Sequence, residues 1–492
     1  MKLIQIQMGD NVAVALSPVE AGEQVSVGGW TLTAAESIPQ GHKLALVPLK
    51  PGDLVYKYGC AIGRVTASVP AGGWVHTHNM TTNLSARIDF SYHPAVKRLE
   101  PEEPEQFLGY LRPDGRAATR NEIWVLPTVG CVNEIASQLA ADNQDLVGGS
   151  VEGLYAFPHP YGCSQTGTDH ANTRAILAGL ARHPNAAAVL VVGLGCENLQ
   201  CSQLMEDLGA EAAERVKFLV CQQVEDELAA GRALLEECAA YAAQFQRQPV
   251  PVSKLVVGLK CGGSDGLSGI TANPVVGRFS DLLVARGGST ILTEVPEMFG
   301  AEELLLGRCA NEEVFRQAAE MLQGFRDYFV SHGENVYENP SPGNKSGGIT
   351  TLEDKSCGCV QKGGTAPIVG VVPYGGQVAR PGLNLLWGPG NDLVSTTALS
   401  AAGAHLILFT TGRGTPFGAP APTLKISSNT VLAAHKPRWI DFDAGSVAEG
   451  ESIDQAARRL FHLVLRTASG APTRSEAAGR RGIAIFKDGV TL

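Results

Sequence analysis

The feature that most constrains the fold is the alternation, from about residue 120 onward, of short apolar runs with helical segments. The run 122–127 (EIWVLP) precedes a helical pattern over 131–142, and the run 186–193 (AAAVLVVG) precedes another over 199–216. Strands that are apolar at every position are buried on both faces, and long helices between them supply parallel crossovers. We therefore predict α/β units with mainly parallel sheets over the larger part of the chain.

The N-terminal part follows a different rhythm, with strand-sized runs separated by turn signals such as GD, GG and PGD. Such closely spaced strands predict a small all-β, clip-like domain over 1–88. A stretch rich in proline and acidic residues, 89–107, reads as a linker. Prolines in the word QRQPVPVSK then divide the rest into an α/β second domain, 108–248, and an α/β C-terminal domain, 249–492.

Charge and cysteine content narrow the classes of partner and compartment. The net charge of −10, from 39 basic and 49 acidic residues, excludes a chain-wide electrostatic footprint for nucleic acid or an anionic membrane. Eleven cysteines in 492 residues are too sparse for a disulfide scaffold, so we expect free thiols and a cytoplasmic location. The first residues lack a continuous apolar region and no run reaches membrane-spanning length, so we expect neither a secretory leader nor a membrane partner.

Cysteine recurs where a predicted strand gives way to a glycine turn. This pattern is found at Cys131, Cys163, Cys196 and Cys261. Ligands of open α/β sheets bind beyond the carboxyl ends of the strands, and a helix that begins there favours a thiolate. These thiols either mark the rim of an active site or fill tight turns as small apolar groups.

Polar side chains accompany these turns and suit a site for a polyol acid or a metal. Glu197 follows Cys196, whereas Ser264 and Asp265 follow Cys261. Each of them has an ordinary alternative role as a helix cap or turn residue. Arg413, in the word TGRGTP, would bind a carboxylate together with backbone N–H groups, unless this word is only a structural turn.

Two histidines in the N-terminal domain, His76 and His78, are separated by one residue in the word VHTHN. Residues two apart in a strand point to one face, so both imidazoles would reach a single cation. A solvent-facing pair without a metal is the alternative. The Gly-rich segment 337–366 shows no clear period, and we expect a long functional or mobile loop there.

Several longer words carry a family resemblance. They include LPTVGCVN (126–133), CGGSDGLSGITANP (261–274), LTEVPEMFGAE (292–302), ENPSPGNKSGGITTLEDKS (338–356) and WIDFDAG (439–445). Together with GHKLAL, KYGCAIG and VHTHN near the start, they resemble the altronate/galactarate dehydratase family and its SAF-type β domain. The word Cys357-Gly358-Cys359 departs from the family pattern at its first cysteine, which favours Cys359 as the functional thiol.

The resemblance implies a hydro-lyase of hexuronate catabolism that dehydrates D-altronate to 2-dehydro-3-deoxy-D-gluconate. It also implies iron(II) as cofactor, with manganese as a substitute. A dehydratase of a related acid such as galactarate, and a non-catalytic sugar-acid binding protein, are the alternatives. The expected partner is a small-molecule sugar acid, and a homo-oligomer is compatible with the sequence.

Dehydration of a dihydroxy acid needs a base for the C2 proton, an acid for the C3 hydroxyl and a stabilised enediolate. We expect His159, Asp169 and His170 to transfer the protons and His76 and His78 to hold the metal, once the linker has folded them over the α/β domain. The residues expected to bind the substrate are Cys163, Glu197, Ser264, Asp265 and Arg413. An iron–sulfur cluster held by the Gly-Cys turns is a competing but less favoured idea, because the cysteines lack CxxC spacing.

Overall fold

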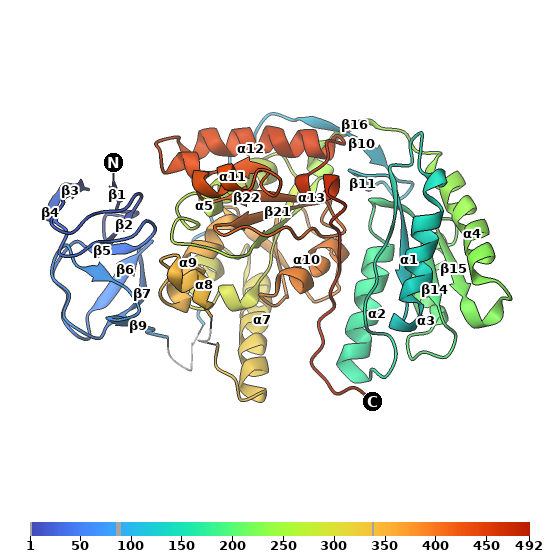
Figure 1. Cartoon of the computed structure of the whole chain (residues 1–492), viewed down its shortest axis with the longest axis horizontal. Helices are drawn as coiled ribbons and strands as arrows, with labels where there is room; N and C mark the ends of the chain where they lie inside the picture. Colours follow the sequence, from blue (N-terminus) through green and yellow to red (C-terminus); the bar gives the residue numbers. More distant parts are fainter. Residues whose placement is uncertain (1, 85–89, 337–338) are drawn as a thin grey trace.

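The computed structural model describes residues 2–84, 90–336 and 339–492. Figure 1 shows three units in a row, with the N-terminal β unit at one end, the C-terminal α/β unit in the middle and the second α/β unit at the other end. The order in space therefore differs from the order in sequence. Hydrogen bonds from Ala95 N–H to the Gly307 carbonyl (2.7 Å) and from Glu102 N–H to the Ala285 carbonyl (3.3 Å) fasten the connecting segment to the C-terminal unit.

The N-terminal unit consists of short antiparallel strands. One sheet has the order β1-β2-β5-β8, formed by β1 (Leu3–Ile4), β2 (Val12–Ala15), β5 (Lys43–Ala45) and β8 (Trp74–Val75). A second has the order β6-β7-β9, formed by β6 (Leu54–Lys57), β7 (Cys60–Val65) and β9 (Met80–Thr81), while β3 (Gln24–Val27) and β4 (Trp30–Thr33) make a hairpin. The prediction of an all-β unit is confirmed.

The second unit is a four-stranded parallel sheet with the order β13-β12-β14-β15. Its strands are β12 (Glu122–Pro127), β13 (Gly153–Ala156), β14 (Ala186–Gly193) and β15 (Val216–Val220), and its helices are α1 (Asn133–Asp142), α2 (Gly167–Ala181), α3 (Cys201–Leu208) and α4 (Glu227–Ala242). Every residue of β12 and β14 is buried, which explains their unbroken apolar sequence. The helix predicted over 199–216 is shorter, because Gly209 with φ +76° ends it.

The chain enters and leaves the second unit through one antiparallel pair of strands. These are β10 (Gln106–Leu111) and β16 (Gln248–Pro251), joined on the other side of β10 by β11 (Ala117–Ala118). The segment between residues 90 and 105 has no regular structure.

The C-terminal unit contains a seven-stranded sheet in which every neighbouring pair is parallel. Its order is β19-β20-β18-β17-β21-β22-β23, with β17 (Val256–Cys261), β18 (Ser289–Leu292), β19 (Ile368–Val372), β20 (Leu383–Leu386), β21 (Leu406–Thr411), β22 (Thr423–Ser427) and β23 (Phe442–Asp443). The main helices are α5 (Ala272–Ala285), α7 (Glu312–Ser331), α10 (Asp392–Ala401) and α12 (Ile453–Ala468). The predicted α/β architecture with mainly parallel sheets is confirmed.

The segment predicted as a long loop, 337–366, is largely helical where the structure describes it, from residue 339 onward. It forms α8 (Pro342–Ser346), α9 (Leu352–Cys359) and a 3₁₀ turn, Val360–Gly363. Side chains at both helix starts supply the caps, since Ser341 accepts from Asn344 N–H and Thr351 accepts from Asp354 N–H. All residues of α9 are buried, so its polar sequence LEDKSCGC carries no helical period that could have been recognised.

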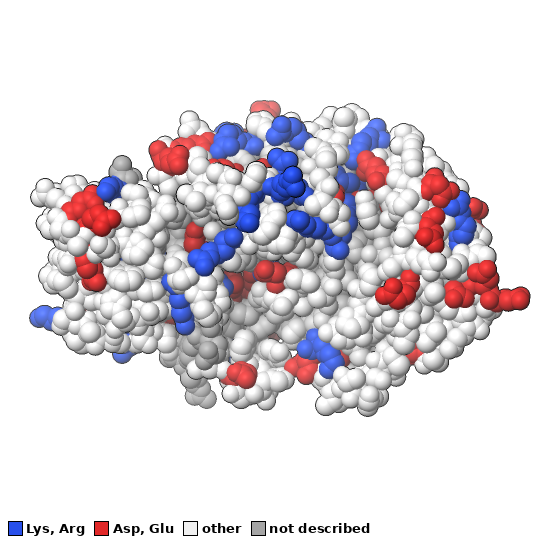
Figure 2. All heavy atoms as spheres, in the orientation of Figure 1, with Lys and Arg blue, Asp and Glu red and all other residues white. Residues whose placement is uncertain are grey.

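The apolar core crosses the boundaries between units. One cluster joins Ile62 and Val75 of the N-terminal unit to Leu259 and Phe299 of the C-terminal unit. A second joins residues of the second unit, such as Trp124, to residues of α10. Figure 2 shows basic side chains in a band across the C-terminal unit and acidic ones toward both ends of the molecule on this face. Within the described residues, no helix is both long enough and apolar enough to cross a membrane.

Candidate active site

The predicted site residues are distributed over three places. His159, Cys163, Asp169, His170 and Glu197 lie in or beside the loops at the carboxyl ends of β12, β13 and β14. Ser264, Asp265 and Arg413 lie beyond the carboxyl ends of β17 and β21. His76 and His78 lie in the turn between β8 and β9, and Figure 1 shows β9 and α2 on opposite sides of the C-terminal unit. Within one chain, the linker therefore does not bring the histidine pair over the second unit.

Three thiols lie at the carboxyl ends of strands in the second unit's sheet. We call these thiols and their loops the cysteine rim. They are Cys131, Cys163 and Cys196, and all three are exposed. Gly130 N–H donates to the Tyr161 carbonyl at 2.9 Å, and Leu199 N–H donates to the Gly162 carbonyl at 3.0 Å. The loop after β13 therefore crosses the end of β12 and touches the loops that carry the other two thiols.

His159 fastens this crossing loop to the strand beneath it. Its Nε2 bonds to the Pro127 carbonyl at 2.7 Å, and its Nδ1 accepts from Tyr161 N–H at 3.2 Å. Burial lowers the pKa of His159 to about 4, so the ring is neutral at pH 7. With both ring nitrogens engaged, His159 positions the loop and has no nitrogen left for a substrate proton.

Close packing and strain surround Cys163. Gly162 has φ +100°, and a Cβ at this position would lie 1.8 Å from the Thr128 carbonyl oxygen, so only glycine allows the crossing. Ser164 has φ +55°, an uncommon value for a residue with a side chain. Such strain persists only where surrounding contacts enforce it, and it concentrates at functional sites.

Glu197 organises the loop that carries Cys196. Its carboxylate accepts from the Thr128 hydroxyl at 2.6 Å and from Leu194 N–H at 3.0 Å, and it also accepts from Gly195 N–H. Although burial opposes ionisation, these donors hold the pKa of Glu197 below its usual value. All these contacts are internal to the rim, so Glu197 shapes the loop and does not present a free carboxylate to a substrate.

Asp169 and His170 begin α2 beside the rim. Asp169 is buried and accepts from Asp488 N–H and Gly489 N–H, both at 2.8 Å, so it binds the C-terminal segment of the chain. His170 is half-buried, and its Nε2 lies 3.1 Å from the Asn198 carbonyl. Its Nδ1 forms no hydrogen bond with the part of the chain that the structure describes, which leaves this nitrogen available at the rim.

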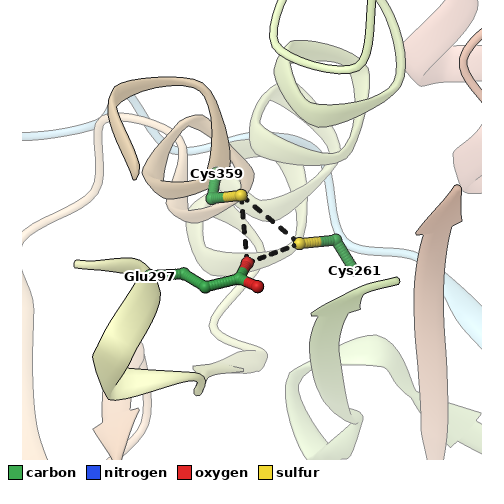
Figure 3. A group of neighbouring side chains, drawn as sticks. All are labelled: Cys261, Glu297 and Cys359. Atoms are coloured by element: carbon green, nitrogen blue, oxygen red, sulfur yellow. Dashed lines mark hydrogen bonds between the residues drawn. The ribbon is translucent and has the colours of Figure 1, made fainter. Parts of the chain in front are cut away.

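A second, fully buried group occupies the carboxyl end of the seven-stranded sheet; we call it the lysine–glutamate cluster. Figure 3 shows Cys261, Glu297 and Cys359 pointing toward one another, with the glutamate oxygen 3.0 Å and 3.1 Å from the two sulfurs. The sulfurs lie 3.4 Å apart. The cluster also contains Lys260, Glu294, Lys355 and Lys362.

The three ligand atoms of Cys261, Glu297 and Cys359 lie within 4.8 Å of one another, which is close enough for one ion. However, buried lysines already compensate the negative charge of this group. Lys355 Nζ lies 2.6 Å from Glu297, and Lys362 Nζ lies 2.9 Å from the Cys261 sulfur. Burial alone would raise the pKa of Glu297, but these lysines hold it far below the usual range. A divalent cation here would meet resident ammonium groups, so the donor set does not suit a metal.

The space beside the lysine–glutamate cluster does not admit a sugar acid. The cavity lined by Asp265, Asp354, Lys355 and Cys359 has a volume of about 10 Å³, roughly enough for one water. A larger cavity of about 700 Å³ opens between the N-terminal unit and residues 300–307. Glu302 and Glu303 belong to its wall, and carboxylates in this position disfavour an anionic ligand.

Asp265 is structural in the same sense as Glu197, because internal hydrogen bonds occupy its carboxylate, whereas Ser264 is buried and is held through its backbone. The Ser264 carbonyl accepts from the Asn344 side chain at 2.8 Å. Asp265 accepts from Ser268 N–H at 2.9 Å and from the Ser428 hydroxyl at 2.8 Å. Arg413 differs, because it is exposed and makes no hydrogen bond or ion pair with the described residues.

The histidine pair lies at the contact between the N-terminal and C-terminal units. β8 ends at Val75, so His76 and His78 occupy a turn instead of the strand on which the shared-face prediction depended. His76 is buried, its Nδ1 lies 3.2 Å from the Thr350 hydroxyl, and burial followed by the charge of Lys43 lowers its pKa to about 4. His78 is exposed. In the described part of the chain no third His, Cys, Asp or Glu atom completes a single-ion site with them.

Comparison with known proteins now gives the family. The chain is 49% identical over its full length to altronate dehydratase of Escherichia coli, which it covers completely, and 48% identical to altronate dehydratase of Bacillus subtilis, over 99% of both chains. The chain belongs to the altronate/galactarate dehydratase family. Galactarate dehydratase (L-threo-forming) of E. coli is 34% identical, over 95% of this chain and 92% of the relative.

Family models match each part of this altronate/galactarate dehydratase family member. They are the altronate/galactarate dehydratase SAF domain (residues 1–83), the D-galactarate dehydratase/altronate hydrolase second domain (109–243) and the D-galactarate/altronate dehydratase C-terminal domain (252–491). The cysteine rim lies within the second of these domains, whereas the lysine–glutamate cluster lies within the third.

Reasoning from the sequence missed the lysines of this family member. Lys260, Lys355 and Lys362 are almost completely buried, although lysine is rarely so. The only available signal was their proximity to Cys261 and Cys359 in the words LKCGG and DKSCGCVQK. Nothing in those words indicates that their carboxylate partners come from the segment after β18.

Proposed function

We propose that the chain is a hydro-lyase that converts D-altronate to 2-dehydro-3-deoxy-D-gluconate, a step of hexuronate catabolism. The observation that carries this proposal is the identity of 49% and 48%, over essentially the full length, to altronate dehydratases of two bacteria. The identity to a galactarate dehydratase is lower, 34%. Galactarate is therefore the second candidate substrate.

The cysteine rim is the best-supported place for the reaction. It lies at the carboxyl ends of parallel strands, where ligands of open α/β sheets bind. It is accessible, whereas the lysine–glutamate cluster is closed to anything larger than a water. The helices α1, α2 and α3 begin directly beyond the three thiols, and their positive ends favour a carboxylate and a developing enediolate.

Removal of water requires a proton to leave C2 and a proton to reach the departing C3 hydroxyl. Of the three residues expected to move protons, His170 has a ring nitrogen available at the rim, while His159 and Asp169 are held by internal hydrogen bonds. His170 is therefore proposed as the proton-transfer group. His159 and Asp169 then act as positioning residues.

Iron, which the family resemblance implies, would supply a Lewis acid for the substrate carboxylate and hydroxyl. Thiolates bind iron in iron–sulfur clusters, and the rim offers three accessible thiols. The pair His76 and His78 offers two imidazoles without a third donor among the described residues. We place the enzyme in the cytoplasm, because all eleven cysteines are free.

The activity is tested by anaerobic incubation of the purified protein with iron(II) and a panel of aldonic and aldaric acids, with detection of the 2-keto-3-deoxy product. The expected result is a kcat/KM for D-altronate at least about tenfold higher than for galactarate. A preference for galactarate would transfer the assignment to that substrate. Binding of D-altronate without product from any acid would identify a sugar-acid binding protein instead.

A further inference from the structure

The distribution of exposed cysteines in this chain is uneven. Free cysteine is among the most buried residue types, and eight of the eleven cysteines are buried or half-buried here. The three that are exposed, Cys131, Cys163 and Cys196, all lie at one edge of one sheet. They come from the loops after three adjacent strands, β12, β13 and β14.

The surrounding structure holds these three loops against one another. The hydrogen bonds from Gly130 to Tyr161 and from Leu199 to Gly162 connect the three loops, and Ser164 N–H donates to the Asn198 side chain at 2.8 Å. The buried His159 ring and the buried Glu197 carboxylate form hydrogen bonds that hold the same loops. A turn that cysteine merely filled would need none of this, and its thiol would face inward.

The spacing of the thiols argues against a single bound ion. Among the described residues, the three sulfurs do not form a group within 4.8 Å of one another, so at least one pair is farther apart than a single ion allows. An iron–sulfur cubane spreads its cysteine ligands over different iron atoms and so accepts a wider arrangement. Cysteines on three separate strand ends meet this need without CxxC spacing in the sequence.

We propose that the cysteine rim binds a [4Fe–4S] cluster through Cys131, Cys163 and Cys196 and leaves one iron without a protein ligand. Each thiol loses its proton when its sulfur bonds to iron, and binding of a preassembled cluster transfers no electron to the protein. A cluster with three thiolates carries net negative charge, which the N-termini of α1, α2 and α3 stabilise. The iron without a protein ligand would serve as a Lewis acid toward a substrate hydroxyl.

A buried amide beside the rim supports the assignment. Gln165 is buried, and its Oε1 accepts from Gly162 N–H and from the Thr173 hydroxyl, both at 3.0 Å. Its Nε2 is buried and has no partner in the part of the chain that the structure describes. An unpaired buried donor costs stability, and hydrogen bonds to cluster sulfurs are a known use of such groups.

Cys221 is the matched control. It follows β15, the next strand of the same sheet, but it is half-buried, and burial raises the pKa of its thiol. We expect it not to be a ligand, because it is partly covered, unlike the three exposed thiols of the rim. Replacing it tests whether the cluster has three cysteine ligands or four.

The experiment measures iron and acid-labile sulfide in protein purified without oxygen, together with visible absorbance and electron paramagnetic resonance after reduction. We expect about four iron and four sulfide per chain in the native protein and in Cys221→Ser. Cys131→Ser, Cys163→Ser and Cys196→Ser are expected to lose nearly all of both, with unchanged circular dichroism. Zinc or sulfide-free iron in the native protein, or retention of the cluster in the rim variants, would overturn the proposal, and loss of the cluster in Cys221→Ser would overturn the three-ligand set.

The cluster site depends only on the rim residues, and its catalytic use rests on the proposed function. The cluster site and the proposed function can therefore be refuted separately. A rim that holds the cluster in a protein that does not dehydrate D-altronate would refute the function alone. Turnover of D-altronate with iron(II) by native protein that contains no acid-labile sulfide would refute the cluster site alone.

Discussion

Lys43 and Asp354 meet at 2.7 Å, and both side chains are fully buried in the contact between the N-terminal unit and α9. Lys57 reaches the other carboxylate oxygen at 3.0 Å. Burial by itself would raise the pKa of Asp354, but the two lysines hold it far below its usual range. One carboxylate therefore compensates two buried ammonium groups across the boundary between two units.

Removing this carboxylate is expected to destabilise the protein strongly. Asp354→Ala leaves two buried lysines without a counter-charge, and we expect the free energy of unfolding to fall by about 3–5 kcal/mol. Urea unfolding followed by circular dichroism measures the change. The matched control is Glu320→Ala, which breaks an exposed pair with Arg316 and should cost no more than about 0.5 kcal/mol. Similar losses for both variants would contradict the assignment.

We expect the free energy of unfolding to fall in acid because of His183. Burial lowers its pKa to about 3, while its Nε2 bonds to the Ala404 carbonyl at 3.0 Å. Below the unfolded pKa of about 6.5 the unfolded chain binds a proton that the folded chain does not. Stability is therefore complete above about pH 6.5 and falls as the pH drops toward 3, by about 1.4 kcal/mol per pH unit for this residue.

His183→Gln keeps an N–H donor for Ala404 but removes the titration. The slope of the unfolding free energy between pH 4 and pH 6 is expected to decrease by about 1.4 kcal/mol per pH unit. Urea unfolding at a series of pH values measures the slope. An unchanged slope would show that His183 is not neutral in the folded protein.

The backbone conformation of Gly162 is expected to be necessary for the structure of the cysteine rim. Gly162→Ala combines a left-handed backbone with a contact to the Thr128 carbonyl that is too short, and we expect a loss of about 2–4 kcal/mol together with loss of bound iron. Gly148→Ala is the control, because nothing lies within 4 Å of its added methyl and no unfavourable φ is involved. Thermal unfolding and iron content measure both variants. Retention of iron by Gly162→Ala would separate the crossing loop from metal binding.

His170 and His159 are expected to differ in how their substitution affects the enzyme. His170→Gln removes the proposed proton-transfer group, so kcat should fall about 10²–10⁴-fold while thermal stability and iron content stay unchanged. His159→Gln is expected to lower stability and iron content together, because the ring fastens the crossing loop. A His170 variant that keeps its kcat and its pH–rate profile would remove this residue from proton transfer.

The sequence predicts the strands well and the site only in part. EIWVLP and AAAVLVVG are strands at the predicted residues, because full burial on both faces leaves a local apolar signal. α9 was not predicted, because its polar residues are buried against partners that are distant in the sequence. Asp354, for example, bonds to Lys43, which lies 311 residues away. The histidine pair was expected on a strand, but β8 ends at Val75, one residue before His76 and three residues before His78.

The predicted polar residues of the rim show a second limit of prediction from the sequence. His159, Asp169 and Glu197 were selected for their chemistry, and they lie at the expected sheet edge. Which of them faces a substrate depends on hydrogen bonds such as that of His159 to Pro127, which no local pattern contains. The repeated Gly-Cys turns, in contrast, were visible in the sequence, although their convergence depends on the loop that crosses β12.

The apolar core that continues from the N-terminal unit into the C-terminal unit implies that the intervening peptide is not what holds them together. A chain cut between residues 84 and 90 is therefore expected to remain a noncovalent complex of two fragments. The fragments should co-elute in size-exclusion chromatography when produced together. Asp354→Ala, introduced into the larger fragment, should promote their dissociation.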